Sequence, residues 1–106
     1  MDRKARVDTS RNGGTVTVTG TGEMDLRIAP LFSQHLKDAA ANGEAVVVDL
    51  RPADFIDSAI LAALAETARL MRKDGRRLAV KVRPGGHPSY VLRVSGIDTV
   101  MDVKTG

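Results

Sequence analysis

The chain has 106 residues, a length that fits one domain and leaves no room for a second. With 42% hydrophobic and 27% charged residues, its composition is that of a folded protein and disfavours the disordered classes. Its 16 basic and 13 acidic residues give a net charge of +3, which is ordinary for a small domain. Because cysteine is absent, disulfide frameworks, thiolate nucleophiles, CxxC redox pairs and thiolate zinc sites are excluded.

The first part of the chain predicts a β-hairpin followed by a helix. Residues 15–19 alternate Thr and Val, as a half-buried strand does, and a Gly-containing turn separates them from a second strand over 6–10. Pro30 marks the start of an amphipathic helix that ends at Asn42-Gly43. The apolar face of this helix is expected to carry Leu31, Phe32, His35, Leu36 and Ala39.

The middle of the chain predicts a buried strand and the best-defined helix. Residues 45–50 form a continuous apolar run without alternation, which is typical of a strand covered on both faces. A loop with Pro52 then leads to Phe55-Ile56. From Ala59 to Asp74 the chain is rich in Ala and Leu at steps of three and four, and we expect Gly75 to end this helix.

The last part predicts two strands around a short helix. Residues 77–82 alternate and indicate a strand, whereas Ser89 is expected to cap a helix that ends at Gly96. The last strand is expected over 100–103. The order β-β-α-β-α-β-α-β defines an α/β fold, a single domain whose mixed β-sheet has at least one parallel crossover and helices packed against it.

Basic side chains concentrate between Arg69 and Arg83, where only Asp74 opposes them. Four of them fall near the predicted end of the second helix, where cations interact favourably with the helix dipole. An acidic partner surface and a nucleic acid are the alternative explanations. No aromatic residue is interleaved with these cations, which argues against base stacking, so we expect no nucleic-acid partner.

The two histidines form no catalytic or metal-binding pattern. His35 falls on the first helix, where a packed or surface role is expected, and His87 stands in a Gly- and Pro-rich turn. A phosphate-cradling loop is the alternative for that turn, although both GxxxxGK[ST] and GxGxxG are absent. We therefore expect no metal, no cofactor and no enzymatic activity.

The sequence also bears on where the protein is located. Residues Met1–Arg6 are polar, and no apolar stretch of the signal-peptide type follows them. Glu66 and Arg69 interrupt the longest apolar helix, so no segment is expected to span a membrane. These features predict a cytoplasmic protein without direct membrane contact.

An acid and a hydroxyl, Asp57 and Ser58, stand between the buried strand and the long helix. Either side chain can cap the helix by accepting a hydrogen bond from a free N–H group, a contribution of about 0.5–2 kcal/mol. The functional alternative is that the helix N-terminus presents Ser58 on a surface where a phosphate is tolerated.

Five segments in register resemble the STAS domain, found in bacterial anti-sigma factor antagonists and in sulfate-transporter tails. The resemblance covers about residues 5–104 and implies one STAS domain, a small α/β sandwich. The five segments are Gly22-Glu23-Met24-Asp25-Leu26 with Pro30, Val46-Val47-Val48-Asp49-Leu50, Phe55-Ile56-Asp57-Ser58, Gly75-Arg76-Arg77-Leu78, and Leu92-Arg93-Val94-Ser95-Gly96-Ile97-Asp98.

The resemblance implies a protein that takes part in partner switching and regulates transcription. An antagonist of this kind binds an anti-sigma factor of the serine-kinase type, which releases the sigma factor and phosphorylates the antagonist, and a phosphatase removes the mark. We therefore expect this kinase and a phosphatase as partners. For Asp25, a turn before the first helix is the alternative to a partner contact. The expected partner-binding and regulatory residues are Asp25, Asp57, Ser58, Ala59 and Ile60.

The chain departs from the family at the phosphoacceptor. The family motif Asp-Ser-Ser/Thr-Gly is replaced by Asp57-Ser58-Ala59-Ile60, so an alanine stands at the usual acceptor position. Either Ser58 is the acceptor or the standard switch is lost, and a helical rotation of about 100° per residue favours loss. The alternative function is a STAS accessory subunit of an ABC-type lipid transporter. Such subunits can carry Asp-Ser-Ala or Asp-Thr-Ala at this position, but they usually keep the glycine that follows, which is Ile60 here.

Overall fold

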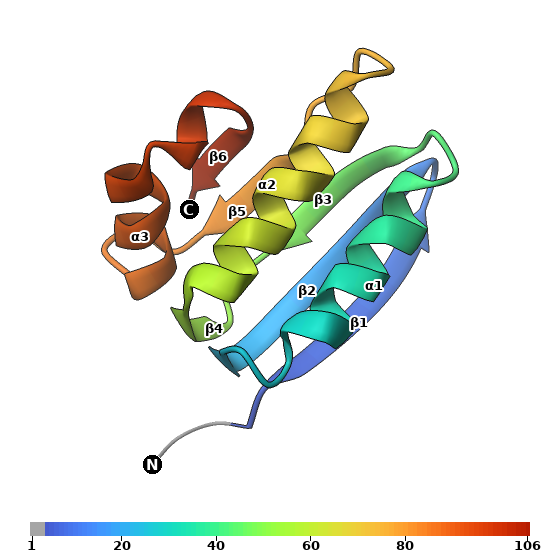
Figure 1. The fold of residues 1–106 in the computed structure, drawn as a ribbon. Coiled ribbons are helices and arrows are strands. Elements are labelled where there is room, and N and C mark those ends of the chain that lie inside the picture. The colour runs from blue at the N-terminus through green and yellow to red at the C-terminus, as the bar shows by residue number, and fades with distance from the viewer. Residues whose placement is uncertain (1–3) are drawn as a thin grey trace.

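The computed structural model describes residues 4–106; Met1, Asp2 and Arg3, which contribute to the prediction of an N-terminus without a signal peptide, lie outside the described residues. The described residues form six strands, three α-helices and one 3-10 turn (Figure 1). In chain order they are β1 (Arg6–Asn12), β2 (Thr15–Met24), α1 (Ala29–Ala40), β3 (Ala45–Asp49), β4 (Ala53–Ile56), α2 (Ser58–Arg72), β5 (Ala79–Val82), α3 (His87–Ser95), η1 (Ile97–Thr99) and β6 (Asp102–Thr105).

The sheet is mixed, as predicted, with the order β1-β2-β3-β5-β6. β1 and β2 form the antiparallel hairpin, in which Arg6 lies opposite Thr21. Its turn uses Gly13 and Gly14 with φ of 57° and 85°, values that side chains with a Cβ adopt at a cost. β3, β5 and β6 are parallel to their neighbours, which confirms the expected parallel crossovers.

The strand β4, which the sequence does not predict, pairs with the far end of β2. The first half of β2 pairs with β3, and its last residues, Gly22–Met24, pair with β4 in parallel. A register shift between Gly22 and Glu23 accompanies this exchange of partners. Four residues without alternation carry little strand signal, so β4 is defined by its tertiary partner. Its end leads directly into Asp57 and α2.

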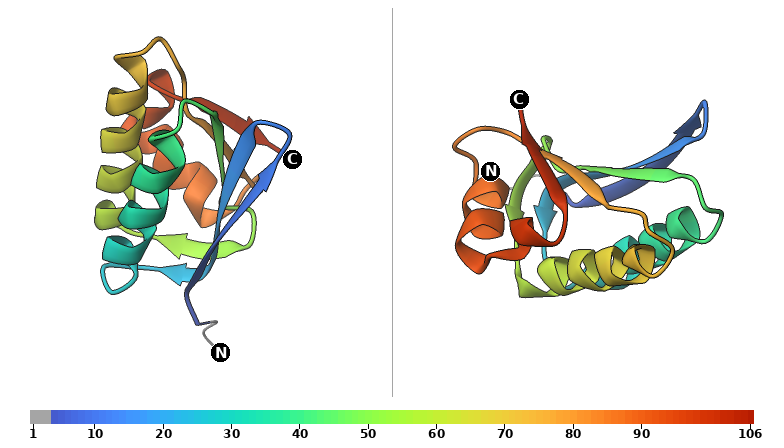
Figure 2. Two further views of the ribbon diagram at one scale, coloured as in Figure 1. Left: turned by 90° about the vertical axis from the view of Figure 1, so that its right-hand side faces the viewer. Right: turned by 90° about the horizontal axis from the view of Figure 1, so that it is seen from above.

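Helices α1 and α2 lie side by side over one face of the sheet, and no helix of residues 4–106 covers the opposite face of β1–β3 (Figure 2). The prediction of a two-sided cover for residues 45–50 is therefore wrong. Val46 and Val48 are buried, but Val47 and Asp49 are only half-buried. Three consecutive valines suit any strand, and only alternate side chains face the helices.

Several boundaries agree with the predictions and others differ: β2 runs to Met24 instead of residue 19, and β5 begins at Ala79 instead of residue 77. Pro30 lies in the first turn of α1, and α2 ends before Gly75. Ser89 does not cap α3, because the N-cap is Gly86. Pro88 occupies the first turn, where an N–H group would have no partner within the helix and its absence removes no hydrogen bond. The last strand begins two residues later than expected, because the 3-10 turn precedes it. No helix of the described chain has the length and apolarity needed to cross a bilayer.

Candidate partner-binding site

Asp57 caps α2. Its Oδ1 accepts hydrogen bonds from the N–H groups of Ala59 at 3.0 Å and Ile60 at 3.3 Å, which confirms the capping prediction for this residue. Its own N–H donates to the carbonyl of Met24 at 3.3 Å, which ties the start of α2 to the end of β2. Ser58, the first residue of the helix, is exposed, and its hydroxyl contacts no described hydrogen-bond partner.

Asp25 follows β2 where Asp57 follows β4, so the two acids leave neighbouring parallel strands whose ends pair as Met24 with Ile56. The carboxylate of Asp25 accepts a hydrogen bond from the backbone N–H of Arg27 at 3.0 Å and pairs with its guanidinium at 2.7 Å. Hydrogen bonding by Arg27 lowers the pKa of Asp25 below its ordinary value. The turn role is thus present, and it favours the ionised carboxylate.

The two residues after Ser58 differ in accessibility. Ala59 is half-buried, whereas the side chain of Ile60 is fully buried in the core. The expectation that Ile60 belongs to a partner-binding surface is therefore wrong for direct contact. The family motif gives no information on helix phase, and the side chain at this position faces the sheet. Ile60 can affect the site only by anchoring the first turn of α2.

Two exposed leucines beside this site were missed. Leu26 is 70% exposed in the loop that follows Asp25, and Leu31 is 48% exposed in the first turn of α1. Leu31 was expected on the apolar face of α1, but Phe32 and Leu36 fill that face and Leu31 points outward from it. The available signal was Leu26 itself, an apolar residue between Asp25 and Arg27 in a short polar loop.

Both histidines form structural contacts. His35 Nδ1 lies 2.6 Å from the hydroxyl of Thr9, which joins α1 to β1. His87 Nδ1 accepts a hydrogen bond from the N–H of Ile56 at 3.2 Å, so the Gly- and Pro-rich turn leads into α3 beside the end of β4. Residues 4–106 contain no cluster of three or more acids and histidines that could hold a metal ion.

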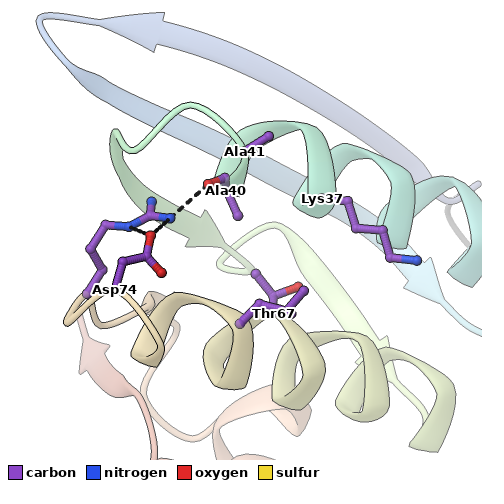
Figure 3. A pocket seen from close by; sticks show the side chains of 7 residues that line it. Lys37, Ala40, Ala41, Thr67 and Asp74 are labelled. Atoms are coloured by element: carbon purple, nitrogen blue, oxygen red, sulfur yellow. Dashed lines mark hydrogen bonds and ion pairs between the residues drawn. The ribbon is translucent and has the colours of Figure 1, made fainter.

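A hollow of about 260 Å³ lies between the C-terminal halves of α1 and α2 (Figure 3). The guanidinium of Arg76 donates to the carbonyls of Ala40 at 2.8 Å and Glu44 at 2.9 Å, and it pairs with Asp74 at 2.7 Å. These contacts satisfy a free carbonyl at the end of α1 and the carbonyl that precedes β3, so this cation has a structural role. The hollow is lined by Lys37, Ala40, Ala41, Thr67, Leu70, Asp74 and Arg76.

The fold and the site together define a small α/β domain with a capped, exposed helix start at the end of two parallel strands. The protein-family model described as "Mlab, STAS domain" matches residues 6–103, and the chain belongs to the STAS domain family. A search of curated protein sequences gave no significant match.

Several solved structures share this fold. An anti-sigma factor antagonist from Mycobacterium paratuberculosis superposes with a TM-score of 0.85 at 24% identity, over 95% of this chain and 86% of that one. The unphosphorylated antagonist SpoIIAA gives 0.77 at 16% identity, over 94% and 89%. The phosphorylated form of SpoIIAA, a Bacillus cell fate determinant, gives 0.68 at 17% identity, over 96% and 92%. The chain therefore has the STAS fold of anti-sigma factor antagonists.

Proposed function

We propose that the protein is an anti-sigma factor antagonist-like regulator that binds an anti-sigma factor of the serine-kinase type in a partner-switching circuit. The observation that carries this proposal is the exposed Ser58 at the capped start of α2, which follows a strand paired with the end of β2, where Asp25 follows. The proposed partner surface comprises Asp25, Leu26, Leu31, Ser58 and Ala59. We call these five residues the α2-start surface.

The chemistry of the α2-start surface favours binding over catalysis. Asp25 is engaged by Arg27, and Asp57 by two helix amides, so neither carboxylate is poised as a general base. Leu26 and Leu31 supply apolar area of the kind that a protein partner buries. We propose a binding module in the cytoplasm, a substrate at most for its partners and not an enzyme.

We further propose that phosphoregulation is altered or lost in this chain. Ala59 stands where the family usually carries the acceptor hydroxyl, and Ser58 is the remaining hydroxyl of the motif. A phosphate adds a charge of about −1.5 to −2. At about 6 Å from a partner carboxylate it would oppose binding by several kcal/mol before screening, at an effective dielectric of about 20. An unmodified surface therefore stays competent to bind.

Incubation with the cognate kinase and ATP, followed by mapping of the phosphate by mass spectrometry, tests the proposed loss. We expect no stoichiometric mark on the natural chain and a mark on the Ala59→Ser variant, because that substitution restores a hydroxyl at the usual position. Ser58→Ala is the matched control, and it should change neither result. A stoichiometric phosphate on Ser58 would overturn the loss and make Ser58 the acceptor, to be reversed by a phosphatase.

A STAS accessory subunit of an ABC-type lipid transporter is the second candidate function, and the string Asp57-Ser58-Ala59 favours it locally. An affinity pull-down from native lysate separates the two functions. Recovery of a small ATPase of the anti-sigma type supports the first, and recovery of transporter subunits supports the second. The charge-reversed variant Asp25→Lys should lose the specific partner in either case. Its melting temperature should fall only slightly, because the Asp25–Arg27 pair that it removes is exposed, and this distinguishes a surface effect from unfolding.

A further inference from the structure

The outer edge of β4 is bound by side chains instead of a strand. β4 pairs with β2 on one side. On the other side, Arg83 donates to the carbonyl of Ala53 at 3.0 Å, and His87 Nδ1 accepts from the N–H of Ile56 at 3.2 Å. A donor and an acceptor from the segment that leads into α3 thus take the places that a neighbouring strand would supply.

The hydrogen bond to Ile56 requires one protonation state of His87. A backbone N–H can only donate, so Nδ1 must be unprotonated and the ring proton must lie on Nε2. His87 is the first residue of α3, and a positive charge is unfavourable at that end of a helix. Its ring also stacks on Phe55, with centroids 4.7 Å apart. The elements packed against α3 carry Asp54 on β4 and Asp98 on η1, Asp57 follows β4, and Arg83, before α3, lies 3.7 Å from the carboxylate of Asp54.

His35 has no comparable restriction. The hydroxyl of Thr9, 2.6 Å from its Nδ1, can donate to a neutral ring and accept from a protonated one. The hydrogen bond between Thr9 and His35 can therefore persist when His35 is protonated. Protonation of His87 at Nδ1 instead turns this atom into a donor that faces the N–H donor of Ile56. Of the two histidines, only His87 is joined to the backbone through a contact that depends on its charge.

We propose that His87 is a positioning residue, which holds Ile56 and thereby the start of α2 in the binding conformation, and that its protonation releases this hold. Ile56 immediately precedes Asp57, whose N–H bonds to Met24 and whose carboxylate caps α2. Because Ser58 is only two residues after Ile56, a displacement of the Ile56 backbone also moves Ser58 at the start of α2. The hydrogen bond between Ile56 and His87 does not depend on the proposed function, whereas its effect on binding rests on that function.

Amide hydrogen exchange measured by NMR tests the hold without a partner. The protection factor of the Ile56 amide, which removes the intrinsic pH effect, is compared at about pH 7.5 and about pH 5.5, on either side of the ordinary imidazole range. In the natural chain it should fall about five- to tenfold at the lower pH, the size expected for loss of one hydrogen bond.

Two variants separate the hydrogen bond from the ring stacking. His87→Phe keeps a ring against Phe55 but removes the acceptor, so Ile56 should be poorly protected at both pH values. His87→Asn keeps an acceptor near the position of Nδ1 and cannot titrate, so protection should stay high at both. A protected Ile56 in His87→Phe overturns the proposal. So does an Ile56 amide in the natural chain that does not respond to pH, a result that needs no variant to fold.

Binding then tests the consequence, with the serine-kinase anti-sigma factor as the probe. The affinity of the natural chain should weaken about five- to tenfold at the lower pH relative to His87→Asn, a comparison that cancels titration of the partner. Equal pH dependence in the two proteins overturns the link between Ile56 and the surface. If no variant binds while Ile56 behaves as expected, the hold is supported and the proposed partner is overturned.

Discussion

The two ends of the α1–α2 pair differ in how their free backbone groups are satisfied. At the C-terminal end, the side chain of Arg76 donates hydrogen bonds to the carbonyls of Ala40 and Glu44. At the N-terminal end, Asp57 caps α2, but α1 has no side-chain cap, and Ser58 stays exposed. The C-terminal end, where a side chain of the protein binds the free carbonyls, serves stability, and we call it the closed end. The N-terminal end keeps exposed polar and apolar groups that are available to a partner, and we call it the open end.

The largest effect on stability is expected from Arg76→Ala, at the closed end. The variant loses charge-assisted hydrogen bonds to two carbonyls, so the free energy of unfolding should fall by about 2–3 kcal/mol. Arg77→Ala is the matched control, because the neighbouring arginine forms only an exposed ion pair with Asp102 and should contribute at most about 1 kcal/mol. Urea denaturation measures both. Equal losses would contradict the structural role of Arg76.

The open end should instead affect binding. Leu26→Ala and Leu31→Ala are each expected to weaken binding of the anti-sigma factor about tenfold, because each removes apolar area from the proposed surface. Both should change the free energy of unfolding by less than about 0.5 kcal/mol, as exposed substitutions do. Leu70→Ala, an exposed leucine at the closed end, is the matched control and should leave affinity unchanged. Isothermal titration calorimetry makes the comparison, and a uniform effect of all three would erase the distinction between the ends.

The cap of α2 can be weakened on its own. Asp57→Ala removes the acceptor for the N–H groups of Ala59 and Ile60 and should lower the free energy of unfolding by about 1 kcal/mol. Asp57→Asn retains a capping oxygen, so its loss should be smaller. Thermal unfolding followed by circular dichroism measures both variants. A loss in Asp57→Asn as large as in Asp57→Ala would mean that charge, and not the cap, is what Asp57 contributes.

The features that could be predicted from the sequence are those with local causes. Gly13-Gly14 can adopt the hairpin turn, Pro30 favours a first helical turn, and Asp57 has the short acceptor that an N-cap needs. Features that depend on a partner distant in the sequence could not be predicted. β4 exists because β2 exchanges partners at Gly22, and His87 acquires its role only when α3 packs beside β4.

Side-chain orientation was the other source of error. A motif position carries no helix phase, so the buried side of Ile60 and the exposed side of Leu31 could not be derived from their neighbours in the sequence. The same holds for the strand 45–50, where three valines hide which face the helices cover. The partner-binding site at Asp57 and Ser58 stays a prediction, and the surface proposed for it includes the exposed Leu26 and Leu31, which the sequence did not indicate.

The smallest effect concerns the charge at the open end. Hydrogen bonds from Arg27 lower the pKa of Asp25, so the folded state holds this carboxylate ionised more strongly than the unfolded state does. The associated stabilisation is complete above the unfolded pKa, about 3.9, and is lost as pH falls through the lower folded pKa. Carbon-13 NMR of the carboxyl group should show Asp25 titrating below the ordinary aspartate range, and Arg27→Ala should return it toward that range. Because the pair is exposed, the change in stability stays small. An unchanged titration in Arg27→Ala would mean that Arg27 does not hold Asp25 in its turn, and the carboxylate would then be free to face a partner.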